Sequence, residues 1–261
     1  MPTGKHSENV WSLIIINLTG KGAACLIGWT EPAAALALWF GPDLLLAYHI
    51  FAPEAQGLVR MHRRFSTVQR EVWLTIDDGP DPDDTPRILE LLATHGVRAT
   101  FFVIGEKAMR HPELIRAIVA AGHEVAHHTH THPVGTFWCA TPARLKRELD
   151  EGAAALRSIG VQPARFRPPA GFKNFWLAHA LRVRGLTCVG WSARGLERWG
   201  GDAEKVAQRA TLGLAPGAIL LLHEGPGVPS PIRVEAIRRV LERLRAQGYR
   251  GVVPSPEQLV D

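Results

Sequence analysis

The sequence predicts an α/β domain built on a parallel sheet, with an apolar helical segment in front of it. From residue 71 onward, short runs rich in β-branched and aromatic residues alternate with amphipathic helical stretches. This alternation is typical of a parallel sheet with outer helices. Residues 11–53, in contrast, carry only three charged residues, Lys21, Glu31 and Asp43. The 261 residues are enough for one domain with a sizeable core plus this extension.

The N-terminal part of the chain predicts a membrane anchor. Residues 1–10 are polar, and we expect them to be loose. Residues 11–29 span about 27 Å as a helix, close to the thickness of a bilayer's hydrocarbon layer, and Trp11 and Trp29 at the ends suit its aromatic belts. A second apolar run covers residues 33–51, so 11–53 reads as a hairpin of two helices. The alternatives are one span plus an interfacial or domain-packed helix, or a cleaved signal peptide, whose apolar core Lys21 would interrupt.

A hairpin that turns at Thr30 and Glu31 would bring the two buried charges of this segment together. Lys21 and Asp43 would lie at depths that differ by about 4–5 Å. A lone charge at that depth is costly, so an ion pair between them is expected; the alternative is that they snorkel or line a surface groove. The small residues at positions 20, 22, 23 and 24 would allow close contact with 33–37.

Residues 54–70 predict a basic linker, with arginines at positions 60, 63, 64 and 70. By the positive-inside rule, these charges place both termini and the domain at 71–261 on the cytoplasmic side of a bacterial-type inner membrane, with membrane lipid as a partner. No basic patch is interleaved with aromatic residues, so nucleic acid is not expected as a partner. Cys25, Cys139 and Cys188 lack metal-ligand spacing and are expected to be free and mostly buried thiols.

Within residues 71–261, the patterns predict six strands and five helices. The helix at 142–159, for example, follows Thr141 as N-cap and has Pro142 at its first position. The expected strands cover 71–76, 100–104, 123–126, 187–191, 218–222 and 251–253. The expected helices cover 86–95, 112–121, 142–159, 203–212 and 232–247.

Two motifs carry the chemistry. Asp77 and Asp78 end the first strand of the domain, just before Gly79 and Pro80, and His128 and His132 follow about fifty residues later. Adjacent strand residues point to opposite sides, so one Asp can bind a metal while the other transfers protons. We assign Asp78, His128 and His132 as metal ligands and Asp77 as general base, the equipment for metal-assisted hydrolysis.

The histidine assignment has an alternative, since His123 and His127 share the four-residue spacing of His128 and His132. In our interpretation, His123 and His127 are satisfied surface or core residues. Two imidazoles and a carboxylate suit zinc as the default metal, and they also accept cobalt, nickel or manganese.

Further motifs follow in order: RFRPPAG at 165–171, the stretch 191–199, and LLLH at 220–223. With the Asp-Asp-Gly-Pro and histidine motifs, they make residues 70–255 similar to the polysaccharide deacetylases (NodB-homology domain, carbohydrate esterase family 4). The resemblance implies a distorted (β/α) barrel with its site at the carboxyl ends of the strands. It also implies that Arg167 holds Asp77 through an ion pair and that His223 is the general acid.

The sequence departs from the family pattern at two places. Ala170 stands where the family has tyrosine, whose backbone N–H helps to hold the oxyanion; the resemblance gives this role to Ala170, while the missing ring opens one wall of the groove. Arg194 stands where the fourth motif has its first aspartate. Glu197 then supplies the only carboxylate that could orient His223 as the family aspartate does.

Taken together, the motifs and the resemblance predict a metal-dependent hydrolase that removes N-acetyl groups from amino sugars of a polysaccharide or lipid-linked glycan. The cytoplasmic location favours the lipid-linked substrate. O-deacetylation or N-deformylation of a lipid-linked sugar would need the same machinery. A catalytically silent glycan-binding relative is the alternative from another class, and the presence of both acids, both histidines and His223 argues against it.

Overall fold

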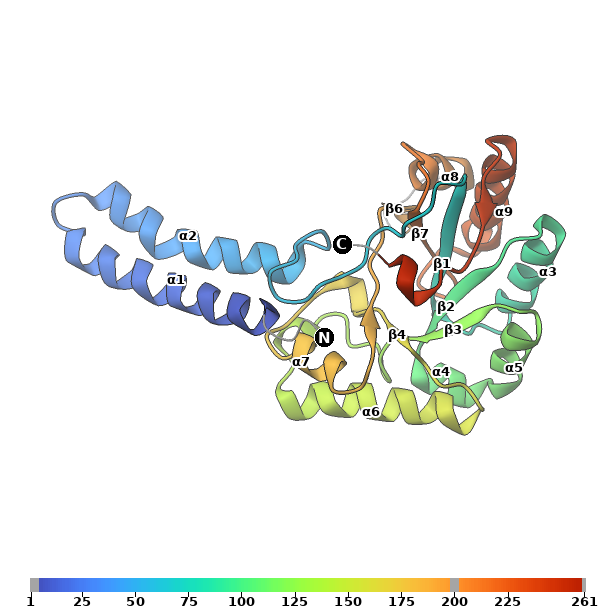
Figure 1. Ribbon diagram of the computed structural model, residues 1–261, viewed down its shortest axis with the longest axis horizontal. Helices are drawn as coiled ribbons and strands as arrows, with labels where there is room; N and C mark the ends of the chain where they lie inside the picture. Colours follow the sequence, from blue (N-terminus) through green and yellow to red (C-terminus); the bar gives the residue numbers. More distant parts are fainter. Residues whose placement is uncertain (1–4, 198–201, 260–261) are drawn as a thin grey trace.

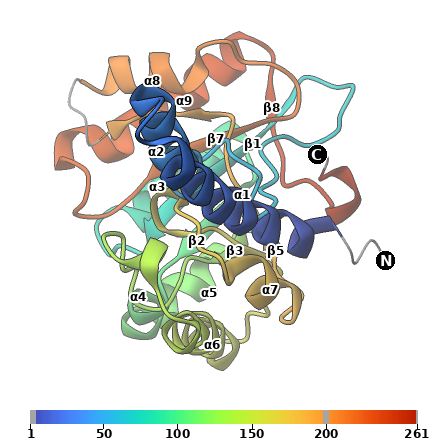
Figure 2. The ribbon, with the colours of Figure 1, turned by 90° about the vertical axis from the view of Figure 1, so that its left-hand side faces the viewer.

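The computed structural model describes residues 5–197 and 202–259. A hairpin of two helices, α1 (Lys5–Ile27) and α2 (Pro32–Phe51), projects from an α/β domain (Figure 1). Viewed along the hairpin, the two helices run side by side in front of the sheet (Figure 2). The hairpin and the position of its turn agree with the sequence prediction. Residues 5–10 do not, because they were expected to be loose and instead form the first turns of α1.

The hairpin is joined by polar contacts and by close backbone packing. Lys21 Nζ lies 3.1 Å from Asp43 Oδ1, which also accepts a 2.6 Å hydrogen bond from Asn17 Nδ2, so the expected ion pair is present. A Cβ on Gly20 would lie 2.8 Å from the carbonyl oxygen of Leu38, which explains why this position needs glycine. A Cβ on Gly22 would meet nothing within 4 Å, so the prediction that this residue faces α2 was wrong.

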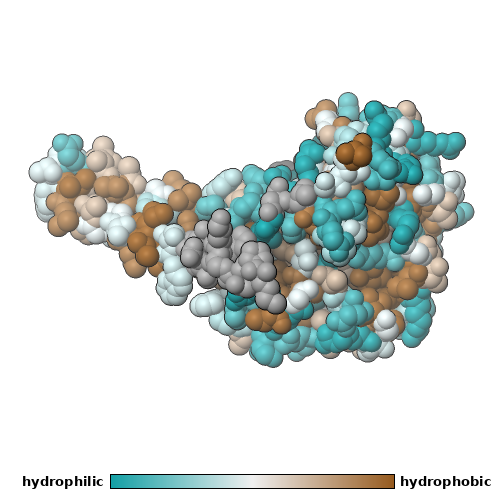
Figure 3. Space-filling view, viewed as in Figure 1, coloured by the Kyte–Doolittle hydropathy of each residue, from teal (hydrophilic) through white to brown (hydrophobic). Residues whose placement is uncertain are grey.

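Both hairpin helices are long and apolar enough to cross a membrane, by length and composition. The candidate spans are Val10–Ile27 and Pro32–Phe51, and only 6% of each is buried within the structure. Figure 3 shows brown, apolar side chains over the hairpin and mostly teal, hydrophilic ones over the domain. The apolar surface of the hairpin therefore has few partners within the described chain.

The domain is a curled parallel sheet covered by helices. In the sheet the order is β5-β4-β3-β2-β1-β7-β6, β8 pairs with β1, and every described ladder is parallel. The strands are β1 (Glu71–Gly79), β2 (Ala99–Val103), β3 (Glu124–His127), β4 (Arg165–Phe166), β5 (Thr187–Cys188), β6 (Ala193–Arg194), β7 (Ala218–His223) and β8 (Arg250–Gly251). The helices are α3 (Thr85–His95), α4 (Gly105–Arg110), α5 (Pro112–Ala120), α6 (Pro142–Ser158), α7 (Leu177–Arg182), α8 (Ala203–Thr211) and α9 (Ser230–Ala246). The curled sheet with outer helices confirms the expected distorted (β/α) barrel.

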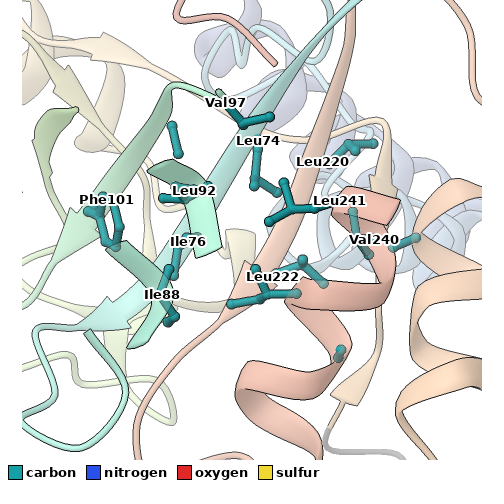
Figure 4. Packing of buried hydrophobic residues seen from close by; sticks show 14 of the residues in the cluster. Leu74, Ile76, Ile88, Leu92, Val97, Phe101, Leu220, Leu222, Val240 and Leu241 are labelled. Carbon is teal, nitrogen blue, oxygen red and sulfur yellow. The ribbon is translucent and has the colours of Figure 1, made fainter. Parts of the chain in front are cut away.

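Strand alternation separates the core from the site. In β1, Leu74 and Ile76 point outward and pack with Ile88 and Leu92 of α3 and with the inner face of α9 (Figure 4). The intervening residues of β1 point to the opposite side, where Trp73 joins a smaller cluster inside the barrel. This alternation carries Asp77 to the inside of the barrel at the carboxyl end of the strand.

The segment 54–70 is not the linker that the sequence suggested, because its middle part completes the barrel. We call residues 59–65 the closing segment. His62 pairs with Val189 just beyond β5, and Arg64 pairs with Ala218 at the start of β7. The closing segment thus links the edge of the sheet at β5 to the start of β7, just before the residues of β7 that pair with β6. Phe65, which the barrel interior buries, fixes this arrangement.

The cysteines differ from expectation in one respect. All three are free, but only Cys188 is buried, whereas Cys25 and Cys139 are exposed. Burial raises the pKa of the Cys188 thiol to about 12, so this thiol stays protonated and inert.

Candidate active site

Asp78, His128 and His132 converge at the carboxyl ends of β1 and β3. One ligand atom from each lies within 4.8 Å of the others. Asp78 Oδ1 is 3.5 Å from His128 Nε2 and 3.2 Å from His132 Nε2. Two imidazole nitrogens and a carboxylate oxygen that face one another form the donor set of a catalytic metal site with open positions. The residues therefore fit a divalent cation.

The surroundings of Asp78 and His128 prepare them as ligands. His128 Nδ1 lies 2.7 Å from the carbonyl oxygen of Arg167 and donates to it, which fixes the ring so that Nε2 faces Asp78. Burial raises the pKa of Asp78, but the hydrogen bond from His128 and the charge of His132 outweigh it and hold that pKa well below its usual range. Lys107 Nζ also donates to the carbonyl oxygen of Asp78 at 2.6 Å.

His132 is placed by a strained loop. Thr129 and His132 both have positive φ angles, 65° and 55°, which cost energy in residues other than glycine. Glu148 of α6 offsets this cost, because its carboxylate accepts hydrogen bonds from the backbone N–H groups of His130 and Thr131 at 3.0 and 2.9 Å. The hydroxyl of Thr131 donates to the same carboxylate at 2.6 Å.

The alternative histidine pair is used elsewhere. His127 Nε2 lies 2.9 Å from the carbonyl oxygen of Leu149, and its Nδ1 accepts from the N–H of Thr129. Burial lowers the pKa of His127 to about 4, so its ring is neutral. His123 Nδ1 accepts from the N–H of Ala99 at 3.3 Å. Both rings support the backbone around the strands, and neither belongs to the described cluster of ligand atoms.

Asp77 lies beside the cluster and is held by Arg167. An Arg167 NH group donates to Asp77 Oδ1 at 2.6 Å, and both residues are buried. Arg167 also donates to the hydroxyl of Thr75 and to the carbonyl oxygens of Val189 and Gly190. The other carboxylate oxygen of Asp77, Oδ2, lies 3.6 Å from His128 Nε2. That oxygen therefore faces the space between the metal ligands, where a proton acceptor is useful.

His223 and Glu197 form a second pair at the pocket, in which Glu197 is buried and His223 is half-buried. His223 is in register with Asp77 across β7 and β1, which brings both side chains to the same edge of the sheet. Glu197 accepts from the ring Nδ1 of His223 at 3.1 Å and from its backbone N–H at 3.0 Å. Burial lowers the pKa of His223, but Glu197 and then Asp78 and Asp77 more than offset this and raise it to about 9. The ring is thus protonated at neutral pH, with Nε2 available as a donor.

A pocket of about 150 Å³ joins these groups. Ala170 lines it from a 3₁₀ turn (Pro169–Gly171), with φ 52° and ψ 14°, in the left-handed region. The pocket is lined by Asp77, Asp78, His128, His132, Val134, Ala170, Trp191, Arg194, Leu196, Glu197, Leu221 and His223. All eight residues that the sequence singled out thus lie at or directly behind one pocket, with Arg167 buried behind Asp77. Within the fourth motif, residues 198 and 199 lie outside the described residues.

Sequence reasoning missed four residues that support the site. Trp191 forms an apolar wall, and the guanidinium carbon of Arg194 lies 5.9 Å from the centre of its ring. Thr75, Lys107 and Glu148 position Arg167, Asp78 and the histidine loop. Thr75 could have been found from strand alternation, since it lies two residues before Asp77. The available signal for Glu148 was a charged residue at a helix position whose neighbours on the same face, such as Leu145 and Leu149, are apolar.

Comparison with known proteins identifies the family of the chain. The family model for polysaccharide deacetylase matches residues 65–189. A chitooligosaccharide deacetylase of Bradyrhizobium sp. (strain ANU 289) is 39% identical over 172 residues, which cover 64% of this chain and 78% of that protein. A peptidoglycan-N-acetylglucosamine deacetylase of Bacillus cereus is 32% identical over 189 residues, covering 72% and 87%.

The solved structures lead to the same family. The family 4 carbohydrate esterase from Streptomyces lividans, in complex with acetate, superposes with a TM-score of 0.65 at 32% sequence identity. The match covers 72% of this chain and 95% of that one. With more than 30% identity over most of the length of both curated relatives, the chain belongs to the polysaccharide deacetylase family.

Proposed function

We propose that this protein is a metal-dependent hydrolase that removes N-acetyl groups from amino sugars of a glycan. One observation supports this proposal most directly: three possible metal ligands and two proton-transfer groups lie in one pocket. One of the two groups can accept a proton and the other can donate one. Asp77 is an acceptor held by Arg167, and His223 is a protonated donor held by Glu197. The relatives, which are named as deacetylases of chitooligosaccharide and peptidoglycan N-acetylglucosamine, support an N-acetylated glycan as substrate.

In the proposed reaction, a bound divalent cation would act as a Lewis acid toward the acetamide carbonyl and the attacking water. Asp77 takes a proton from that water as the water oxygen attacks the carbonyl carbon. The backbone N–H of Ala170 stabilises the negative charge that develops on the carbonyl oxygen. His223 Nε2 gives its proton to the amide nitrogen as the carbon–nitrogen bond breaks, and acetate and a free amine leave.

For the cation, we propose Asp78, His128 and His132 as ligands and zinc as the metal. The support is the donor set itself, since two imidazoles and one carboxylate are typical of catalytic zinc sites. Cobalt, nickel and manganese bind the same donors, with affinities that differ by metal.

For the location, we propose that α1 and α2 cross a bacterial-type inner membrane as a hairpin with the domain on the cytoplasmic side. The support is the length, apolar character and low burial of both helices, together with the Lys21–Asp43 pair between them. Arginines at 60, 63, 64 and 70 follow α2, and the hairpin turn carries none. In that location, the substrate is a lipid-linked N-acetylated glycan, presented at the membrane surface.

The test is product analysis with the full-length protein in detergent, loaded with zinc. Incubation with an N-acetylated chitooligosaccharide should release acetate and an equal amount of free amine, measured by mass spectrometry. Asp77→Asn is the matched control, because it should retain the metal and lose about 10²–10⁴-fold in rate. Release of acetate without a free amine would instead establish O-deacetylation, and release of formate from a formylated sugar would establish deformylation. If no acylated sugar is hydrolysed, the protein is a silent glycan-binding relative.

A further inference from the structure

The end of the anchor helix α2 touches the loop that carries Ala170. The backbone N–H of Lys173 donates to the carbonyl oxygen of Ile50 at 3.0 Å, and Lys173 Nζ donates to the carbonyl oxygen of Ala52 at 2.5 Å. Both acceptors belong to the C-terminal end of α2, where carbonyl groups lack partners within the helix. A lysine is also favourable there because the helix dipole places negative charge at this end.

Lys173 makes these contacts from inside the protein. Its side chain is fully buried, and burial lowers its pKa to about 8. A buried ammonium group is costly unless it is well paired, so the bond to Ala52 is worth more than a surface contact. The contact between the end of α2 and the loop is therefore part of the buried interior and not a surface contact.

The residues next to Lys173 join the same contact. Gly171 has φ 73°, and a Cβ there would lie 2.7 Å from the ring of Trp191 and 3.3 Å from Pro53. Gly171 is thus enclosed between a wall of the active site and the residue that follows α2. The ring of Phe172 packs edge-on against Phe51 with centroids 5.2 Å apart.

This contact bears on Ala170, because a left-handed conformation in a residue with a Cβ persists only where its surroundings enforce it. Ala170 lies three residues before Lys173 and directly before Gly171. We infer that the C-terminal end of α2 holds the loop 170–173, so that Lys173 is a positioning residue for the oxyanion-binding N–H of Ala170. The inference deepens the proposed function and rests on it. The end of the apolar hairpin then helps to position the active site as well as anchoring the domain.

The experiment compares Lys173→Met with Lys205→Met in the full chain, on the same N-acetylated chitooligosaccharide. Lys173→Met keeps an unbranched side chain but removes the bond to Ala52, whereas Lys205 is exposed on α8. We expect Lys173→Met to lower kcat about 10–100-fold, a part of the cost of losing an oxyanion donor. KM should change less than about threefold, and bound metal per chain and both limbs of the pH profile should stay unchanged. Lys205→Met should behave as wild type.

A second pair of variants covers the case in which Lys173→Met does not fold. Phe51→Ala removes the contact with Phe172 without affecting a buried charge, and Phe40→Ala is its control on an exposed face of the same helix. A loss of kcat in Phe51→Ala but not in Phe40→Ala supports the inference. Full kcat in Lys173→Met or in Phe51→Ala, with an active wild type, overturns it. An inactive wild type overturns the proposed function instead, so the two failures are distinct.

Discussion

At the scale of single residues, Glu197 determines the charge of His223. Its two carboxylate oxygens accept from the ring and from the backbone of the same histidine. The extra methylene relative to aspartate does not prevent this contact, because Glu197 approaches from the loop beyond β6. The result is an imidazolium whose pKa is raised to about 9, although its partial burial lowers that pKa. A general acid must be protonated before it acts, so this pair extends the active range toward alkaline pH.

The first prediction concerns the alkaline limb of the pH profile. In the wild type, His223 loses its proton as the pH rises through about 9, so kcat/KM should fall there. Glu197→Gln removes the carboxylate charge, which should lower the pKa of His223 and move this limb by about one pH unit or more toward neutral pH. Glu197→Asp, which keeps the charge, serves as control. An alkaline limb that stays in place in Glu197→Gln would show that another group sets it.

The second prediction uses two histidines of one short motif. His132→Ala should reduce bound zinc well below one per chain, because His132 Nε2 faces Asp78 at 3.2 Å. His130→Ala should retain the metal, since His130 Nε2 points instead toward Glu151, 3.9 Å away. Metal content after dialysis, measured by inductively coupled plasma mass spectrometry, decides between them. Equal zinc in the two variants would remove His132 from the ligand set.

At the scale of elements, the site is assembled from loops that follow the strands and are fixed by helices outside the sheet. Glu148 is the clearest example: one carboxylate of α6 accepts two backbone N–H groups and a hydroxyl from the loop between His128 and His132. The helix thereby sets the separation of the two imidazoles. We therefore expect the metal affinity of the site to depend on a residue outside the proposed ligand set.

The third prediction follows from this contact. Glu148→Ala leaves the loop's donors unpaired, which should weaken zinc binding about 10–100-fold and lower the free energy of unfolding by about 1–3 kcal/mol. Competition with a zinc chelator gives the affinity, and denaturant titration gives the stability. Glu151→Ala, an exposed neighbour on the same helix, is the control. Unchanged zinc affinity in Glu148→Ala would mean that the loop keeps its shape without α6.

The elements also show how far the sequence could predict the fold. The long strand β1 and the helix α6 were predicted to within three residues of their ends, because their patterns are long and their start signals strong. The strand β4 and the helix α7 were missed, since two and six residues carry no readable period. The closing segment was misread as a linker, because its arginines suggested solvent. Its place in the barrel comes from partners far along the chain, such as Val189 and Ala218.

The residues that converge on the pocket were easier to single out from the sequence than some elements of the fold around them. Asp77, Asp78, His128 and His132 lie in compact motifs, where chemistry restricts the residue types. Glu148 and Lys173 escaped prediction because each acts through a partner distant in sequence, and spacing along the chain does not reveal such pairs.

At the scale of the whole molecule, the apolar hairpin and the catalytic domain are joined at several points. The last turn of α2 contacts the loop 170–173, and the closing segment continues from it into the barrel. The domain therefore has a defined orientation relative to α2, and the active site lies close to the end of α2, since Gly171 is in contact with both Trp191 of the pocket and Pro53. In the proposed membrane location, the pocket lies near the bilayer surface.

The fourth prediction tests on which side of the membrane the domain lies. Val68 is fully exposed between the closing segment and β1, so Val68→Cys is open to a thiol reagent. With Cys25 and Cys139 replaced by serine, a membrane-impermeant reagent should label Val68→Cys only after the cells are permeabilised. Thr30→Cys, in the hairpin turn, should be labelled in intact cells. The opposite pattern would place the domain outside and favour a wall polysaccharide as substrate.

The closing segment has a consequence for biosynthesis. Translation produces it before any strand of the sheet, yet its partners Val189 and Ala218 follow more than 120 residues later. A ribosome that adds about 5–20 residues per second leaves the segment waiting for roughly 6–30 seconds. During that interval the nascent sheet has open edges, which are prone to wrong pairing. The closing segment is therefore the first part of the barrel to be made, yet it can pair with β7 only after most of the sheet has been translated.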